Sequence, residues 1–164
     1  MAYARYVETI RALIRGDVEF LVVGMAAAIM QGAPSLTLDL DIVHKRSAEN
    51  VEKLLRVLDQ IHAVARHDDR KLKPNASHLI GPGHILLDTD NGHFDCLGEI
   101  DGGKSYDDLF SHSTLALLDD GSQVRVLELA TLIEVKRRAG RAKDMAVMPV
   151  LEATLRESRR LGLK

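Results

Sequence analysis

Two aspartates one residue apart, Asp39 and Asp41, are the first side chains in this 164-residue sequence whose types and spacing could do chemistry. They lie in an apolar segment, residues 37–43, in which polar and apolar residues alternate. In a strand, both carboxylates would lie on one face, about 6.7 Å apart at their Cα atoms. Two unit charges about 5 Å apart repel by roughly 3 kcal/mol at an effective dielectric constant near 20. A bound Mg²⁺ would offset that repulsion, whereas a solvated strand face is the commoner explanation for such a pair taken alone.

A second feature is the glycine between a predicted strand, residues 19–23, and a predicted helix, residues 25–31. The first N–H groups of a helix and the positive end of its dipole attract anions, and glycine lets an anion come close. Gly24 could equally be an ordinary turn residue. Together with the two acids it predicts a phosphate site beside a metal site.

A third carboxylate would complete a site for two metal ions, and Asp95 is the best candidate. It lies within an apolar strand predicted over residues 93–97, where an unpaired carboxylate has no easy explanation. The other candidates flank a turn or follow the strand and are more easily solvated: Asp88, Asp90, Glu99 and Asp101.

The order and spacing of these residues resemble the DNA polymerase β-like nucleotidyltransferase superfamily. Within it, the sequence is most similar to small bacterial nucleotidyltransferases of the abortive-infection toxin type. The likeness covers residues 18–155 and is carried by these residues and stretches: Gly24, Met25, Asp39, Asp41, Asp95, 32–39, 92–100 and 126–144. It implies an α+β nucleotidyltransferase fold, in which a mixed β-sheet has helices packed on one side and a C-terminal helical pair follows.

The resemblance also implies an Mg²⁺-dependent transfer of a nucleoside monophosphate from an NTP to a hydroxyl group on RNA, protein or a small molecule. Asp39, Asp41 and Asp95 would be the catalytic residues and the ligands of two Mg²⁺ ions. The residues expected to contact the nucleotide are Gly24, Met25, Thr37, Lys136, Arg141 and Lys143. For the last three, a solvated helix face explains the charges equally well.

Two positions depart from the pattern of the superfamily. Met25 stands where relatives carry glycine or serine, and Ser35 stands where they often carry arginine. A catalytically weak or inactive nucleotide-binding or protein-interaction module of the same fold is therefore the alternative function.

Composition is that of an ordinary globular protein, with 46% apolar and 28% charged residues and a net charge of −2. A single cysteine, Cys96, excludes an intramolecular disulfide and favours a reducing cytoplasm. The longest apolar run, residues 20–30, is too short to cross a bilayer, so we expect no membrane partner.

Residues 1–124 carry a net charge of −7 and residues 125–164 a net charge of +5. The resemblance to toxin-type nucleotidyltransferases implies a cognate antitoxin or a second copy of the chain as a possible protein partner.

Hydrophobic periodicity predicts the elements that must position the acids. The predicted helices are 3–14, 25–31, 48–61, 128–139 and 144–161, and the predicted strands are 19–23, 37–43, 84–88, 93–97, 114–118 and 123–127. Residues 62–83 have a weak pattern and are expected to form a loop or lid. The sequence thus predicts one domain over residues 1–164, with a core at about 18–127 and C-terminal helices at about 128–161.

Overall fold

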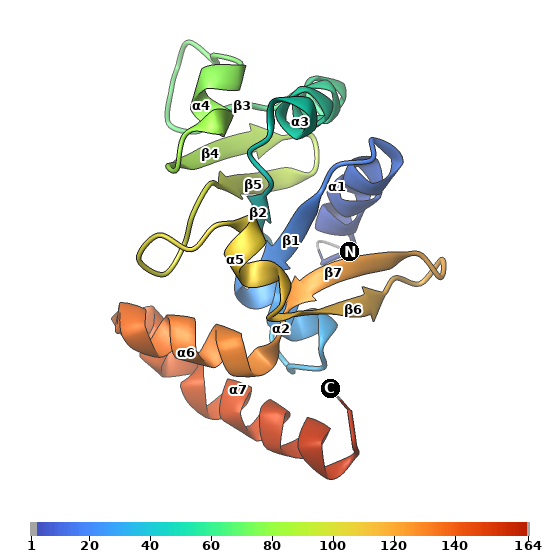
Figure 1. Ribbon diagram of the computed structural model, residues 1–164, viewed down its shortest axis with the longest axis vertical. Helices are drawn as coiled ribbons and strands as arrows, with labels where there is room; N and C mark the ends of the chain where they lie inside the picture. The colour runs from blue at the N-terminus through green and yellow to red at the C-terminus, as the bar shows by residue number, and fades with distance from the viewer. Residues whose placement is uncertain (1–2, 164) are drawn as a thin grey trace.

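A mixed β-sheet runs through the computed structural model, which describes residues 3–163 (Figure 1). Along the chain the elements are α1 (Tyr3–Arg15), β1 (Phe20–Val23), α2 (Gly24–Met30), β2 (Leu40–His44), α3 (Ala48–Gln60), β3 (Val64–Ala65), α4 (Ala76–Ile80), β4 (His84–Thr89), β5 (Gly92–Leu97), α5 (Tyr106–Phe110), β6 (Ser113–Leu117), β7 (Gln123–Leu127), α6 (Leu129–Ala139) and α7 (Ala142–Arg160). None of the described helices is long and apolar enough to cross a membrane.

The strand order of the sheet is β3-β4-β5-β2-β1-β7-β6. The central strand β2 pairs antiparallel with β1 and parallel with β5, while β1 pairs parallel with β7. Parallel and antiparallel pairs in one sheet confirm the predicted α+β class. The pairing of β2 with β5 places residues that are more than fifty positions apart in the sequence directly beside each other.

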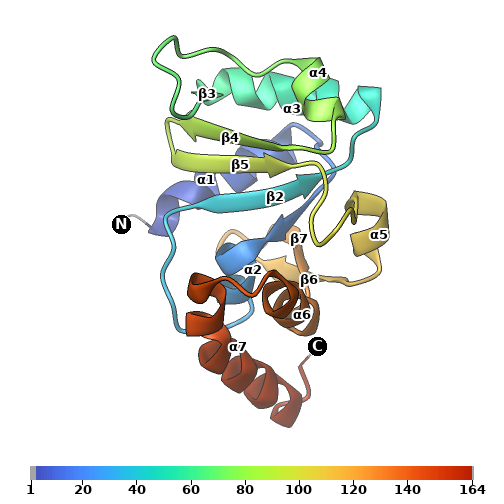
Figure 2. The ribbon, with the colours of Figure 1, turned by 90° about the vertical axis from the view of Figure 1, so that its left-hand side faces the viewer.

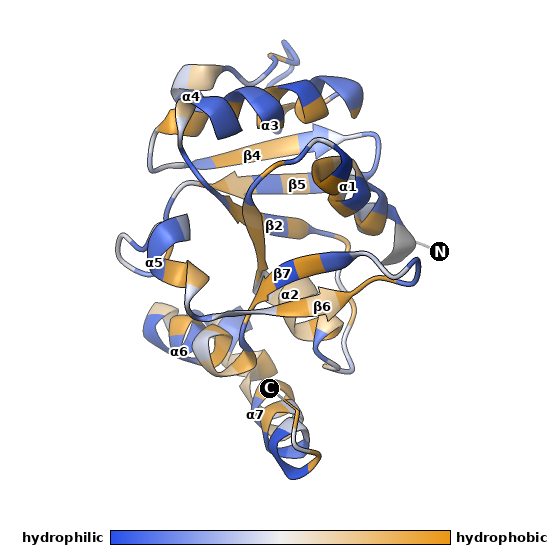
Figure 3. Cartoon of the chain, turned by 45° about the vertical axis from the view of Figure 1, so that its right-hand side comes forward, coloured by the Kyte–Doolittle hydropathy of each residue, from blue (hydrophilic) through white to orange (hydrophobic). Residues whose placement is uncertain are grey.

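The two faces of the sheet have different coverings. One face carries Leu40, Ile42 and His44, and the His44 ring is hydrogen-bonded through Nε2 to the carbonyl oxygen of Leu79 in α4, at 2.7 Å. Helices α1, α3 and α4 form the expected layer on this face, and Figure 2 shows them along the upper half of the sheet. Figure 3 shows hydrophilic and hydrophobic stretches alternating around α1 and α3, as in helices with one buried side.

The opposite face carries Asp41 and Asp95 and is only partly covered. Strand residues that pair side by side point to the same face, so Arg125, which precedes Val126 in β7, lies on this face too. Its guanidinium stacks over the ring of Phe110 in α5, 4.4 Å from the ring centroid. Helix α5 therefore covers the β1–β7 side of this face.

The C-terminal helices α6 and α7 form the predicted helical pair and pack against each other below the sheet (Figures 1 and 2). Gln31, at the end of α2, joins this pair to the sheet. Its side-chain amide donates to the carbonyl oxygens of Ala27 (2.9 Å) and Leu127 (2.8 Å), and its oxygen accepts from the N–H of Leu129 (3.3 Å).

Several predicted boundaries differ from the structure. The strand predicted over residues 37–43 begins only at Leu40. The predicted loop at residues 62–83 contains the short strand β3 and the short helix α4, whose N-terminus is capped by the side chain of Asn75. Helix α5 was not predicted, although Ser105 and Asp108 form a capping box at its start.

Asn50 of α3 fastens the start of β1 to the end of β2. It is 2% exposed, donates to the carbonyl oxygens of Glu19 (2.9 Å) and Lys45 (2.8 Å), and accepts from the N–H of Glu19 (2.8 Å). Buried polar groups that lose their partners keep their full desolvation cost. The side chain of Asn50 thus holds together the two strands that carry the candidate site.

We expect Asn50→Leu to lower the free energy of unfolding by about 2–4 kcal/mol, because the N–H of Glu19 and the carbonyl oxygen of Lys45 lose this partner and the carbonyl oxygen of Glu19 keeps only its bond from Lys45. Urea denaturation measures this loss. Ser47→Ala, which removes the N-cap of the same helix, is the matched control and should cost about 1 kcal/mol. Equal losses in the two variants would contradict the role assigned to Asn50.

Candidate active site

Asp41 and Asp95 lie directly opposite each other on the parallel strands β2 and β5. Their carboxyl groups point to the same face of the sheet and are hydrogen-bonded to each other. Burial raises the pKa of Asp41 to about 6, and the charge of Asp95, the shared hydrogen bond and the charge of Asp39 act in the same direction. The charge of Lys136 opposes this shift. Two of the three predicted acids thus form a close pair whose negative charge is not fully balanced.

Gly24 lies against this pair because β1 also neighbours β2, with Val23 opposite Asp41. Its φ angle is +66°, and a Cβ atom there would lie 2.6 Å from Oδ2 of Asp41. Only glycine fits both the left-handed backbone and the nearby carboxylate. The anion that Gly24 accommodates in this structure is therefore the carboxylate of Asp41.

Met25 and Thr37, both predicted to contact a nucleotide, have local structural partners. The side chain of Met25 is half-buried and packs against the hydrophobic core. The Thr37 hydroxyl accepts a hydrogen bond from the N–H of Asp39, at 3.3 Å, and so shapes the segment before β2.

Asp39 is exposed and lies one residue before β2, in a loop where a strand had been predicted. Its charge reaches Asp41 but adds no third close ligand. Across residues 3–163, no three Asp, Glu, His or Cys side chains stand close enough to hold a metal ion together. The three predicted acids therefore adjoin one another without forming a three-ligand cluster in this conformation.

Lys136 reaches the site from α6 and is held by a buried acid. Its ammonium lies 3.3 Å from Asp144 of α7, and the two side chains are 14% and 1% exposed. Burial alone would raise the pKa of Asp144, but hydrogen bonds from Arg141 and Lys136 outweigh it and hold that pKa below its ordinary value. Asp144 thus holds the ammonium of Lys136, whose charge acts on Asp41.

Arg141 and Lys143 are further from the pair. Arg141 is 60% exposed and forms its ion pair with Asp144 at 2.6 Å, and Lys143 is exposed at the start of α7. Of the three predicted cations, Lys136 is the one that the structure brings to the acids.

Arg66, which the sequence did not single out, contacts Asp95 directly. Its Nη2 donates to Oδ1 of Asp95 at 2.5 Å, and the two side chains are 13% and 16% exposed. The residue follows β3, in the stretch whose weak pattern had suggested a loop. Only the register of β3 on β4 reveals that this arginine lies next to the acids.

The donor groups fit a divalent cation. Asp41 and Asp95 offer carboxylate oxygens side by side, which Mg²⁺ prefers together with water and phosphate oxygens. No lysine or arginine of the described residues forms an ion pair with Asp41, and the glycine at position 24 lets its carboxylate lie close to the backbone.

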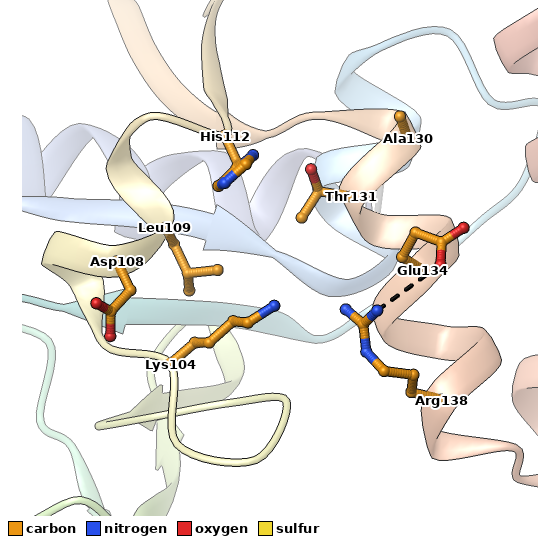
Figure 4. A pocket seen from close by; sticks show the side chains of 8 residues that line it. All are labelled: Lys104, Asp108, Leu109, His112, Ala130, Thr131, Glu134 and Arg138. Carbon is orange, nitrogen blue, oxygen red and sulfur yellow. Dashed lines mark ion pairs between the residues drawn. The ribbon is translucent and has the colours of Figure 1, made fainter.

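A surface hollow of about 540 Å³ lies between α5 and α6, apart from the acid pair (Figure 4). Figure 4 shows the side chains of Lys104 and Arg138 projecting across it, and both cations pair with Asp101, at 2.9 Å and 2.5 Å. Residues of α6 that line it, such as Thr131, lie on a different side of the helix from Lys136. The hollow is therefore not the acid-bearing site.

Comparison with solved structures identifies the class of fold. The structure is similar to that of TM1012 from Thermotoga maritima, described as a candidate nucleotidyltransferase, with a TM-score of 0.59, 17% sequence identity and 96% of each chain covered. It is also similar to the solution structure of the antibiotic-resistance factor ANT(2'')-Ia, with a TM-score of 0.58, 12% identity, and 93% of this chain and 83% of that chain covered. The chain thus has a nucleotidyltransferase fold. The sequence matches no protein-family model and no curated protein.

We expect Gly24→Ala to disturb the site more than its strained backbone alone explains, because the new Cβ would collide with Oδ2 of Asp41. Gly32→Ala is the matched control, since Gly32 also has a positive φ, +102°, but open space around its Cβ. The control should lose about 1 kcal/mol of stability and Gly24→Ala at least about twice that. Thermal denaturation measures both, and equal losses would show that Asp41 does not restrict position 24.

The raised pKa of Asp41 predicts a pH-dependent stability. The folded protein keeps a proton up to about pH 6 that an unfolded chain, with a pKa of 3.8, has already lost. The folded state is therefore increasingly penalised as the pH rises from about 4 to 6, by on the order of 3 kcal/mol in total.

In EDTA, urea denaturation of the wild type and Asp41→Asn should give a stability difference that grows in favour of the variant across this pH range. A difference that stays constant from pH 4 to pH 7 would contradict the environment assigned to Asp41.

Proposed function

We propose that this protein is an Mg²⁺-dependent nucleotidyltransferase, which moves a nucleoside monophosphate from an NTP to a hydroxyl acceptor. The observation that carries the proposal is the Asp41–Asp95 pair beside Gly24, with the charge of Lys136 acting on it, on a fold shared with nucleotidyltransferase-like structures. An acid pair of this kind raises the local negative charge unless a cation binds there.

The residues divide the work between cation and nucleotide. Asp41 and Asp95 would hold Mg²⁺, with Asp39 available from the exposed loop, and in the proposal two ions bind once the NTP is present. Bound there, Mg²⁺ would neutralise phosphate charge, favour attack of the acceptor hydroxyl on the α-phosphorus atom and stabilise the pyrophosphate that leaves. Lys136 supplies a fixed positive charge for the phosphates, because Asp144 holds its ammonium in place.

The remaining predicted residues would contact the nucleotide or the acceptor. In the proposal, the backbone at Gly24 and Met25 lies beside the phosphates, and Thr37 lines the nucleotide site. Arg141 and Lys143, at the turn between α6 and α7, would steady phosphates or an RNA acceptor.

The acceptor and the biological setting are part of the proposal. The candidate acceptors are hydroxyl groups of RNA, protein or a small molecule. The sequence resemblance to abortive-infection nucleotidyltransferases supports a toxin–antitoxin component in the cytoplasm, with a cognate antitoxin or a second copy of the chain as partner. The fold likeness to an antibiotic-resistance factor keeps a small molecule among the acceptors.

A second candidate function is a nucleotide-binding or protein-interaction module that transfers nothing. Arg66 favours it, because its guanidinium already pairs with Asp95. Ser35 favours it as well, because it supplies no positive charge. Met25 favours it too, because it stands where relatives carry glycine or serine and offers no hydroxyl group.

Purified protein incubated with each α-labelled NTP, Mg²⁺ and total cellular RNA or protein should label one acceptor class. We expect Asp41→Asn and Asp95→Asn to lower labelling by at least about a hundredfold, and EDTA to abolish it. Glu52→Gln, which removes an exposed acid from α3 on the opposite face, is the control and should keep full activity.

Isothermal titration with Mg²⁺-NTP separates the two candidates. NTP binding that needs Asp41 but is never followed by labelling would favour the non-catalytic module. The same affinity for Mg²⁺-NTP in the wild type and in Asp41→Asn would contradict nucleotide binding at the acid pair, and with it the transferase, and would leave only the protein-interaction module.

A further inference from the structure

The guanidinium of Arg66 is fixed on the face of the sheet that carries the acids. Its Nη2 donates to Asp95 (2.5 Å) and to the carbonyl oxygen of Leu87 (2.9 Å), and its Nε donates to Asp88 (3.3 Å). The arginine is therefore held by three acceptors from the two adjacent strands β4 and β5.

The backbone explains why this arginine reaches the acids. Ala65 of β3 pairs with Leu87 of β4, and the N–H of Arg66 donates to the carbonyl oxygen of Leu86 at 2.9 Å. Arg66 thus continues the ladder opposite Leu86, which itself lies opposite Asp95 on β5. Residues that are opposite in a ladder share a face, so the side chains of Arg66 and Asp95 meet across β4.

Asp95 consequently lies between an acidic side chain and a basic one. On one side its carboxyl group is hydrogen-bonded to Asp41, and on the other it is paired with Arg66. A planar guanidinium orients a carboxylate well, but its permanent charge also repels any cation that approaches the same oxygens. Arg66 thus both orients Asp95 and competes with a metal ion for it.

We propose that Arg66 is a positioning residue that holds Asp95 beside Asp41 and lowers the affinity of this acid pair for a divalent cation in the absence of nucleotide. The inference rests on the proposed function, in which the pair binds Mg²⁺. In addition, it explains how nucleotide would regulate metal binding at that site. The free protein binds the cation weakly because the guanidinium repels it. When metal and nucleotide bind together, the negative charge of the NTP phosphates offsets the positive charge of the guanidinium.

Binding of Mn²⁺ alone, followed by electron paramagnetic resonance and by isothermal titration, tests the proposal. Arg66→Met and Arg66→Gln remove the charge, and we expect each to bind Mn²⁺ at least about tenfold more tightly than the wild type. Arg66→Lys keeps the charge and should stay within about threefold of the wild type. A general loss of structure would weaken Mn²⁺ binding, so tighter binding is not explained by damage to the fold.

Arg46→Met is the matched control. Arg46 is also a partly buried arginine, paired with Glu99 at 2.9 Å, but it lies beyond the far end of β2 from Asp41. Its substitution should leave Mn²⁺ affinity unchanged, and thermal denaturation verifies that every variant is folded.

The outcomes separate this inference from the proposed function. Equal or weaker Mn²⁺ binding by Arg66→Met and Arg66→Gln would overturn the role of Arg66 and leave the nucleotidyltransferase proposal intact. Binding by these variants but not by the wild type would support the inference in its strongest form. If neither the wild type nor any Arg66 variant binds Mn²⁺ at millimolar concentration, the inference is overturned, whereas the metal-dependent function, in which ion and NTP bind together, is decided by the titration with Mg²⁺-NTP.

Discussion

The pairing of β2 with β5 in one register is the constraint on which the candidate site depends. A shift of one residue would turn Asp95 to the opposite face, where α1, α3 and α4 lie, and would leave Asp41 without a neighbour of its kind. The register is fixed by the buried residues of the other face, including Leu40 and Phe94, which are both 1% exposed. Burial of the apolar face thus sets the distance between the acids on the polar face.

The acids are surrounded by groups from every part of the chain. Gly24 comes from the first strand–helix junction, Arg66 from the strand pair β3–β4, and Lys136 from the C-terminal helices. Each is itself held by a specific partner, such as Asp144 for Lys136. Because no single segment contains the site, it forms only when the whole domain has folded.

The sequence predicted the two central acids because both lie in apolar strands, where periodicity is informative. It placed Asp39 on the same strand as Asp41, since alternation extends back to Thr37, but a hydrogen bond between Thr37 and the backbone of Asp39 shapes a loop there instead. Alternation of polar and apolar residues does not by itself distinguish a strand from a loop with the same pattern. The alternation predicted that Asp41 points away from the apolar face of its strand, but it did not predict that the strand begins only at Leu40.

Arg66 could not be identified from local patterns, because it lies in a charged stretch and meets Asp95 only through a tertiary strand pairing. Helix α5, in contrast, had a usable signal, since Ser105 and Asp108 have the spacing of a capping box. The position of Lys136 in the site depends on the packing of α6 with α7, which sequence periodicity predicts only as a pair of helices.

Gln31 couples the positions of two helices next to the candidate site. Its side chain joins the end of α2 to the junction of β7 and α6, so the helix that begins at Gly24 and the helix that bears Lys136 are braced against each other. The two helices are therefore expected to shift together and not independently.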